Sequence, residues 1–191
     1  MRRLYDWMMR LAAGPRAIPA LAIVAFVESS FFPIPPDLLL IPMVLAAPRK
    51  AWRYAAIATL ASVAGGFLGY AIGYFLFTTV GRPILDFYGA MSRYAALQAA
   101  YDHWGVWIIV LKGMTPIPYK IVTIASGALG FPLVAFGVAS LVSRALRFFL
   151  VAALLYYFGE PVRAFIERRL TLVTSAFVIL VVGGFVAVAY L

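Results

Sequence analysis

Cysteine is absent from the 191 residues, and histidine occurs once. The lack of cysteine excludes disulfides, thiol catalysis and metal sites built from thiolates. Charged residues make up only 12% of the chain, against about a quarter in soluble domains, whereas hydrophobic residues make up 65%. No polar stretch is long enough to form a separate soluble domain. The composition therefore predicts a single membrane domain over residues 1–191.

Signals for catalysis are also scarce. The one histidine, His103, lies next to Trp104. With Tyr101 and Trp107 nearby, it suits the aromatic belt at a membrane interface. A catalytic histidine needs a nucleophile partner, and the sequence holds no Gly-x-Ser-x-Gly and no His-Glu-x-x-His motif. We therefore expect no enzyme, no cofactor and no metal site.

The net charge of +9 raises the question of a nucleic-acid partner. The basic residues, however, cluster at the ends of apolar segments. This placement favours the positive-inside rule and contact with lipid headgroups. We therefore expect membrane lipids with phosphate headgroups as partners, no nucleic acid, and an N-terminus in the cytoplasm. Homo-oligomerisation stays open.

Five apolar segments follow the N-terminal residues 1–19. Residues 1–19 are interpreted as an interfacial segment, with an ordinary cytoplasmic lead-in as the alternative. A helix needs roughly 20 residues to cross the hydrocarbon core, so the second, fourth and fifth segments are adequate single spans. The five segments are Ala20–Ala47, Ala55–Val80, Gly105–Gly130, Pro132–Gly159 and Leu170–Leu191.

The first and third segments contain internal prolines. Proline removes a backbone donor and breaks a helix, and such a break inside lipid must be covered by protein or water. Two half-helices that enter, turn at the prolines and leave on the same side satisfy this condition. We therefore predict two re-entrant hairpins. Their prolines are Pro33, Pro35, Pro36 and Pro42 in the first and Pro116 and Pro118 in the second.

The two proline breaks look like copies of one another. Residues 33–37 read Pro-Ile-Pro-Pro-Asp, and residues 116–120, 83 positions later, read Pro-Ile-Pro-Tyr-Lys. The spans that follow also correspond: at an offset of 78, Ser62 falls on Ser140. At the same offset Gly66 and Gly69 fall on Arg144 and Arg147. The alternative, that Pro-Ile-Pro recurs by chance, stays open.

A hairpin plus one span per copy forces the second copy to start from the opposite face of the membrane. Such inverted repeats, with broken helices meeting near the midplane, are typical of transporters. The predicted fold is thus all-α and polytopic, with two inverted repeats, each a re-entrant helical hairpin plus a transmembrane helix. The boundaries are 20–83 for repeat 1, 84–104 for an interfacial connector, 105–161 for repeat 2 and 170–191 for a final transmembrane helix.

Six ionisable residues are predicted at membrane depth. Each costs about 2.5–3.5 kcal/mol at a helix centre on insertion scales, so their retention implies pairing, water access or a charged ligand. The acids come from the first repeat and the bases from the second, so hairpin tips that meet would let them neutralise one another. They are Glu28, Asp37, Lys112, Lys120, Arg144 and Arg147.

Four bases against two acids leave a surplus positive charge, which suits a phosphate. Lys112, Lys120, Arg144 and Arg147 are the candidate substrate-binding residues, and Glu28 and Asp37 the candidates for proton coupling or ion pairing. As an alternative, the two acids are only structural partners of the two lysines. Arg147 alternatively extends to a headgroup at the surface. Gly65, Gly69 and Gly73, spaced by four, predict a close helix-packing stripe.

These motifs resemble the DedA family, also known as the VTT or SNARE-associated domain, and most closely its shorter YqaA-like branch. The resemblance rests on Glu28 before Phe-Phe-Pro-Ile-Pro-Pro-Asp37, on Thr-Pro-Ile-Pro-Tyr-Lys at 115–120, and on Ser-Gly-Ala at 126–128. It runs from about Phe26 to Gly159. It implies two inverted re-entrant hairpins, lipid translocation and a bacterial inner membrane location.

The resemblance also implies roles for single residues. Glu28 and Asp37 match the acidic positions of the family, and Arg144 and Arg147 match its basic ones. The chain departs from the family pattern with lysine at 112 and 120, where many members have arginine, and with Ser143, where glycine is common.

We therefore expect a membrane lipid transporter, a flippase or scramblase, for an anionic phospholipid or polyprenyl phosphate, with proton coupling as a further expectation. Two alternatives remain at this point: an ion or proton channel that uses the same charges, and a non-transporting membrane scaffold in which the charges only hold the hairpins together.

Overall fold

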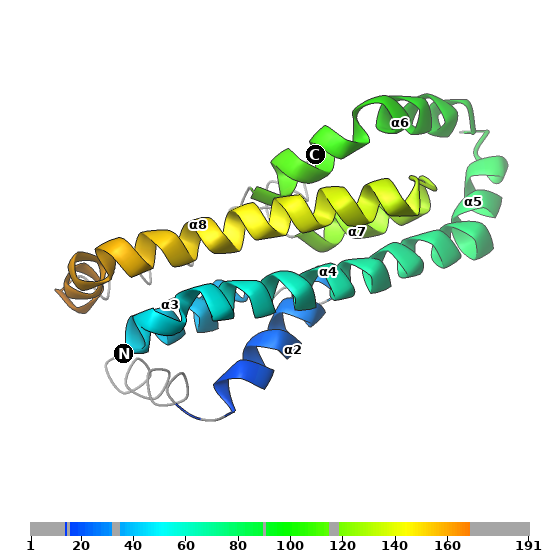
Figure 1. Cartoon of the computed structure of the whole chain (residues 1–191). Helices are drawn as coiled ribbons and strands as arrows, with labels where there is room; N and C mark the ends of the chain where they lie inside the picture. The colour runs from blue at the N-terminus through cyan, green and yellow to red at the C-terminus, as the bar shows by residue number, and fades with distance from the viewer. Residues whose placement is uncertain (1–13, 15, 32–34, 90, 115–118, 169–191) are drawn as a thin grey trace.

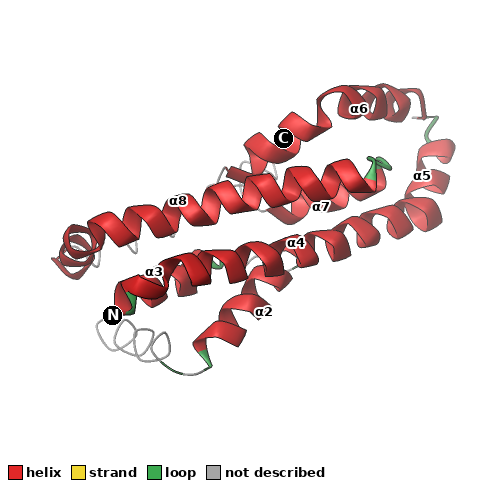
Figure 2. Ribbon diagram, in the orientation of Figure 1, coloured by secondary structure: helices red, strands yellow, loops and turns green. Residues whose placement is uncertain are grey.

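The computed structural model describes residues 14, 16–31, 35–89, 91–114 and 119–168. These residues form helices and connecting turns with no strand among them, which confirms the all-α class (Figure 2). The predicted final span 170–191 and residues 1–13 lie outside the described part of the chain. The elements are α2 (Ala17–Ser30), α3 (Asp37–Ala46), η1 (Pro48–Lys50), α4 (Ala51–Leu76), η2 (Phe77–Gly81), α5 (Arg82–Phe87), α6 (Met91–Met114), α7 (Tyr119–Ala128) and α8 (Leu133–Arg168).

Two long helices, α4 and α8, lie side by side and run in opposite directions (Figure 1). Trp52 near the start of α4 stacks on Phe149 at 6.1 Å between ring centroids, whereas Phe67, further along α4, meets Phe136, earlier in α8, at 5.7 Å. Pro48–Phe87 and Leu133–Gly159 are long and apolar enough to cross a membrane. The second and fourth predicted segments are therefore confirmed as candidate spans.

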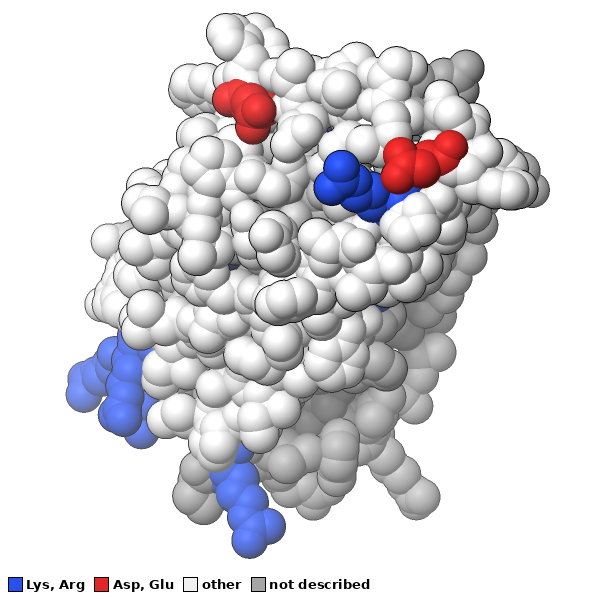
Figure 3. Space-filling view, turned by 90° about the vertical axis from the view of Figure 1, so that its right-hand side faces the viewer, with Lys and Arg blue, Asp and Glu red and all other residues white. Residues whose placement is uncertain are grey.

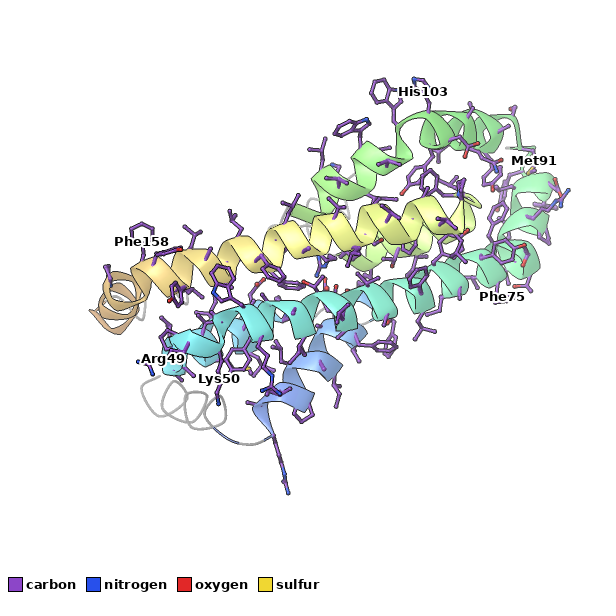
Figure 4. All side chains as sticks on the ribbon, in the orientation of Figure 1. Arg49, Lys50, Phe75, Met91, His103 and Phe158 are labelled. Carbon is purple, nitrogen blue, oxygen red and sulfur yellow. The ribbon has the colours of Figure 1, made fainter. Side chains whose placement is uncertain are left out.

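The backbone of α8 loses regular geometry where the apolar segment was predicted to end. Phe158 has φ −118° and ψ 18°, and Pro161 follows within the same helix. Figure 4 places Phe158 at the same end of the molecule as Arg49 and Lys50.

The first proline-containing segment is two short helices. With 14 and 10 residues, α2 and α3 extend about 21 and 15 Å at 1.5 Å per residue. Neither alone covers a hydrocarbon core of about 30 Å. Pro36 precedes the first residue of α3, Asp37, whose negative charge in the first turn suits the helix dipole. The helix α2 begins at Ala17 rather than at the predicted Ala20.

The second break separates α6 from α7. The helix α6 begins at Met91, well before the predicted segment start at Gly105, so residues 91–104 of the predicted connector are helical and continuous with residues 105–114. After α7 the chain turns at Gly130, where φ is +66°, a conformation that favours glycine. The N–H of Phe131 donates to the carbonyl of Ser126 at 2.9 Å across this turn.

The predicted glycine stripe is a close-packing surface. A Cβ added at Gly65 would strike the carbonyl oxygen of Phe26 in α2, and one at Gly73 would strike that of Ile124 in α7. Gly69 between them faces the Thr123 hydroxyl. The missing side chains thus let the backbones of α2 and α7 lie directly on α4. The helix-packing prediction is confirmed.

Two apolar clusters fill the interior, and the site lies between them. One joins α2, α3, the start of α4 and the later part of α8, and includes Leu21, Met43 and Phe148. The other joins α6, α7 and the first part of α8, and includes Tyr119 and Phe136. Along α8, for example, Arg144 lies between Phe136 of one cluster and Phe148 of the other.

Candidate functional site

Arg144 lies close to the middle of the apolar span Leu133–Gly159 and is only 1% exposed. Its Nη2 donates to Glu28 Oε2 at 3.0 Å in an ion pair that joins α8 to the end of α2. Its Nε donates to Ser62 Oγ on α4 at 2.7 Å. A guanidinium at this depth requires such partners, because an unpaired buried charge is very costly.

Both oxygens of Glu28 are occupied. Besides Arg144, Oε2 accepts a hydrogen bond from Ser29 Oγ at 3.1 Å, and Oε1 accepts one from the Tyr119 backbone N–H at 3.2 Å. The Ser29 hydroxyl also lies 2.6 Å from Ser62 Oγ. Glu28, Ser29, Ser62 and Arg144 therefore form a closed ring of hydrogen bonds.

Aromatic rings cover the faces of the guanidinium. Arg144 Cζ lies 4.5 Å from the ring centroid of Tyr119 and 4.9 Å from that of Phe148, both at cation–π distance. The Tyr119 hydroxyl donates to Ser140 Oγ at 2.7 Å, which fixes its ring in place. We refer to Glu28–Arg144 as the sealed pair, because both carboxylate oxygens are hydrogen-bonded and the faces of the guanidinium are covered.

A second ion pair lies one helical turn along α8. Arg147 Nη2 donates to Asp37 Oδ2 at 2.5 Å, and joins α8 to the first turn of α3. The side chains of Arg147 and Asp37 are 21% and 18% exposed, far more than that of Arg144. Asp37 Oδ1 is buried and has no hydrogen-bond partner in the described residues. We refer to Asp37–Arg147 as the open pair.

The described residues that flank the two proline breaks lie beside these pairs. Besides the bond from the Tyr119 N–H to Glu28, Lys120 Nζ donates to the carbonyl of Phe31 at 3.3 Å. Thr123 Oγ1 donates to the carbonyl of Ser29 at 3.0 Å. A cation at the C-terminal end of α2 is favourable for the helix dipole. The start of α7 is thus bonded to the end of α2.

The structure brings the acids of the first half together with bases of the second half. The partners of the two acids are the arginines of α8, not Lys112 and Lys120. Glu28 and Asp37 form ion pairs with Arg144 and Arg147. The arginines lie three residues apart on α8 and so share one face of that helix. Lys120, in the first turn of α7, is half-buried and its side chain reaches the end of α2. Lys112 is exposed in the last turn of α6.

Three residues of the site carry no signal in the sequence. Ser29, Ser62 and Tyr119 hold the sealed pair, yet an isolated serine in an apolar helix usually bonds its own backbone. The one available hint was the correspondence of Ser62 with Ser140, because the Ser62 hydroxyl accepts from Arg144 and the Ser140 hydroxyl accepts from Tyr119, whose ring covers Arg144.

Charged residues are sparse elsewhere on the molecule. The face in Figure 3 is largely uncharged, with Lys and Arg toward its lower end and, in its upper part, basic atoms directly beside acidic ones. The described residues contain no group of three His, Cys, Asp or Glu side chains that could hold a metal ion.

Comparison with known proteins assigns the family. The model of the VTT domain matches residues 34–157, which include the second proline break, Asp37 and both arginines, and leave out Pro33 and Glu28. The chain belongs to the VTT domain family. This VTT protein therefore shares with its family an association with membranes, in keeping with its apolar helices.

Two relatives match nearly the whole VTT chain. An uncharacterized protein of Haemophilus influenzae is 35% identical over 179 residues, which cover 94% of this chain and 93% of that protein. A second uncharacterized protein, from Histophilus somni, is 34% identical over the same length and the same shares. No solved structure matches the chain.

Proposed function

We propose that this protein moves lipids with phosphate headgroups across the bacterial inner membrane, as a flippase or scramblase. The observation that carries the proposal is the pair of ion bridges, Glu28–Arg144 and Asp37–Arg147, in the middle of an apolar span. Ionisable groups at such a depth typically mark a pathway or a ligand site. A surplus of cations selects an anion, and phosphate is the lipid group that a guanidinium binds best.

The arrangement of the helices supports two re-entrant hairpins in inverted repeats. The first arm α2 packs on α4 as the first arm α6 packs on α8. The second arms cross over: α7 packs on α4, and α3 packs on α8. A twofold relation between the repeats requires that each second arm packs on the span of the other repeat. The spans α4 and α8 correspond to one another and run antiparallel, as this relation also requires.

The surroundings of each base suggest different parts in transport. Arg147 is the proposed phosphate contact, because its side chain is accessible and its partner Asp37 leaves one oxygen unbonded. Arg144 binds no lipid directly in this proposal and instead positions the neighbouring helices around the site. Lys112 and Lys120, near the two breaks, add positive potential on the path to Arg147.

Proton coupling follows from the same pair. A phosphate that binds Arg147 competes with Asp37 for the guanidinium. The carboxyl released from the guanidinium is the proposed proton carrier of a coupled cycle. Movement of the lipid would in this way be linked to a pH gradient.

The test is reconstitution in vesicles with labelled lipid phosphates, with and without a pH gradient. We expect lipid movement by the wild-type protein, and its loss in Asp37→Asn and Arg147→Ala at unchanged membrane insertion. Asp86→Asn, an exposed acid in α5, is the matched control and should move lipid normally. Ion flux without lipid movement would instead identify a channel, and no flux of either kind would favour a scaffold.

The re-entrant topology has its own test, because the chain has no native cysteine. Cysteines at exposed Arg16 and Lys50 flank the first hairpin, and cysteines at Tyr88 and Leu133 flank the second. We expect the first two to react with an impermeant thiol reagent from the cytoplasmic side and the other two from the opposite side. Reaction of Arg16→Cys and Lys50→Cys from opposite sides would exclude the first hairpin.

A further inference from the structure

Asp37 Oδ1 is the one buried side-chain polar atom without a hydrogen-bond partner in the described part of the chain. The other oxygen of this carboxyl accepts from Arg147 at 2.5 Å. A buried acceptor without a donor is costly, and nearly all such atoms in proteins are satisfied by protein, water or a ligand. The described residues thus leave an acceptor in place without supplying its donor.

Comparison with Glu28 shows that the other carboxylate of the site has no oxygen without a donor. Each oxygen of Glu28 has at least one donor, from Arg144, Ser29 and the Tyr119 backbone. The side chains of Asp37 and Arg147 are 18% and 21% exposed, so a group from outside can reach the pair, and a donor for the buried Oδ1 must enter from the exposed part of the pair. An unbonded acceptor therefore lies directly beside an accessible guanidinium.

Resting on the proposed function, we propose that Asp37 Oδ1 selects lipids whose headgroup carries a hydrogen-bond donor beside its phosphate. Arg147 would hold the phosphate, and an N–H or O–H of the same headgroup would donate to Oδ1. An ethanolamine ammonium, a glycerol hydroxyl and the acid proton of a polyprenyl monophosphate all qualify. The trimethylammonium of choline and a methyl phosphate ester do not, because neither has a polar hydrogen.

Two matched lipid pairs test this selection in vesicles that contain the wild-type protein. Acyl-labelled phosphatidylethanolamine is compared with phosphatidylcholine, and phosphatidylglycerol with phosphatidylmethanol. Within each pair the phosphate and the net charge stay the same and the donor is lost. We expect the donor-bearing lipid to move about tenfold faster or more, as for a hydrogen bond to a charged acceptor. Polyprenyl monophosphate in a separate arm distinguishes an acid-proton donor from an ammonium or hydroxyl.

The outcomes separate this inference from the proposed function. Equal rates within both pairs would overturn the selection while lipid transport stands, and failure to move any lipid would overturn transport itself. Because Asp37→Asn is expected to lose transport, its preference is measured as binding of the same lipids, and the ratio within each pair should fall toward one since the amide carries its own N–H donors. A retained ratio in that variant would assign the selection to another group. Asp86→Asn should keep the wild-type ratio, and an Asp37→Asn protein that does not fold leaves the wild-type pairs to decide.

Discussion

The sealed pair and the open pair use the same chemistry, one carboxylate and one guanidinium, in two different settings. Arg144 is 1% exposed, bonded to Glu28 and Ser62 and covered by two aromatic rings. Arg147 lies one turn away, is 21% exposed, and holds a carboxylate with one oxygen unbonded. The comparison teaches that depth in the bilayer does not decide the role of a charge. Its neighbours do.

A fully satisfied buried network is stable only as a unit, because the loss of one member leaves the others unpaired. A partly satisfied pair can exchange partners with less loss. The proposed function therefore gives the sealed pair an architectural role and the open pair the exchange of ligands. Four changes test this division, in order of decreasing effect.

The largest effect is expected from breaking the sealed pair. Glu28→Gln leaves Arg144 as an uncompensated buried cation, which should lower the free energy of unfolding by about 3–5 kcal/mol. Thermal unfolding in detergent measures the change. Asp37→Asn is the comparison, with a smaller loss because its partner Arg147 can reach solvent. Equal losses in the two variants would contradict the division of roles.

A smaller loss is expected when the helix beside the sealed pair is displaced. In Gly65→Ala the new Cβ meets the Phe26 carbonyl, which should push α2 away from α4 and cost about 1–3 kcal/mol. Gly66→Ala is a matched control on the next residue, because its nearest neighbour would be a Thr123 methyl carbon at 3.5 Å. Unfolding of the two variants measures the difference, and similar stability would rule out the tight contact.

Exchanging the charges of the open pair separates stability from transport. Asp37→Arg combined with Arg147→Asp restores an ion pair in the more accessible setting, so we expect unfolding within about 1 kcal/mol of wild type. Lipid movement in vesicles should still be lost, since the cation then lies on α3 and the acceptor on α8. Full transport by the double variant would mean that the open pair serves only to hold the helices together.

The smallest effect concerns the ring that covers Arg144. Tyr119→Phe removes the hydrogen bond to Ser140 but keeps the cation–π contact, so a loss of about 1 kcal/mol is expected. Tyr119→Leu removes both and should cost more. Unfolding in detergent again measures the change. A Phe variant as unstable as the Leu variant would assign the stabilisation to the hydroxyl rather than to the ring.

Much of the fold could be predicted because it depends on local rules. Prolines at 33–36 and 116–118 mark the breaks, and the apolar segment ending at Gly159 matches a candidate span. Glycines at spacing four predicted the close contacts of α4. The start of α6 at Met91 was missed, because residues 91–104 are more polar than the segments used to define spans.

The site was predictable in its charges but not in its pairings. The sequence shows acids in one half and bases in the other, yet which base meets Glu28 depends on the rotation of α8 about its own axis. That rotation is set by packing across the whole helix, including Phe136 and Phe148. Ser62 could not be identified as an Arg144 partner, because Thr59 on the same helix bonds its own backbone instead, to the carbonyl of Ala55.

The glycine face of α4 limits how the molecule can move. Backbone atoms of α2 and α7 lie directly on it, with no long side chain between them to absorb a shift. Displacement of either short helix along α4 must therefore break these contacts, so in the proposed topology a single helix would link the hairpin of one membrane leaflet to that of the other.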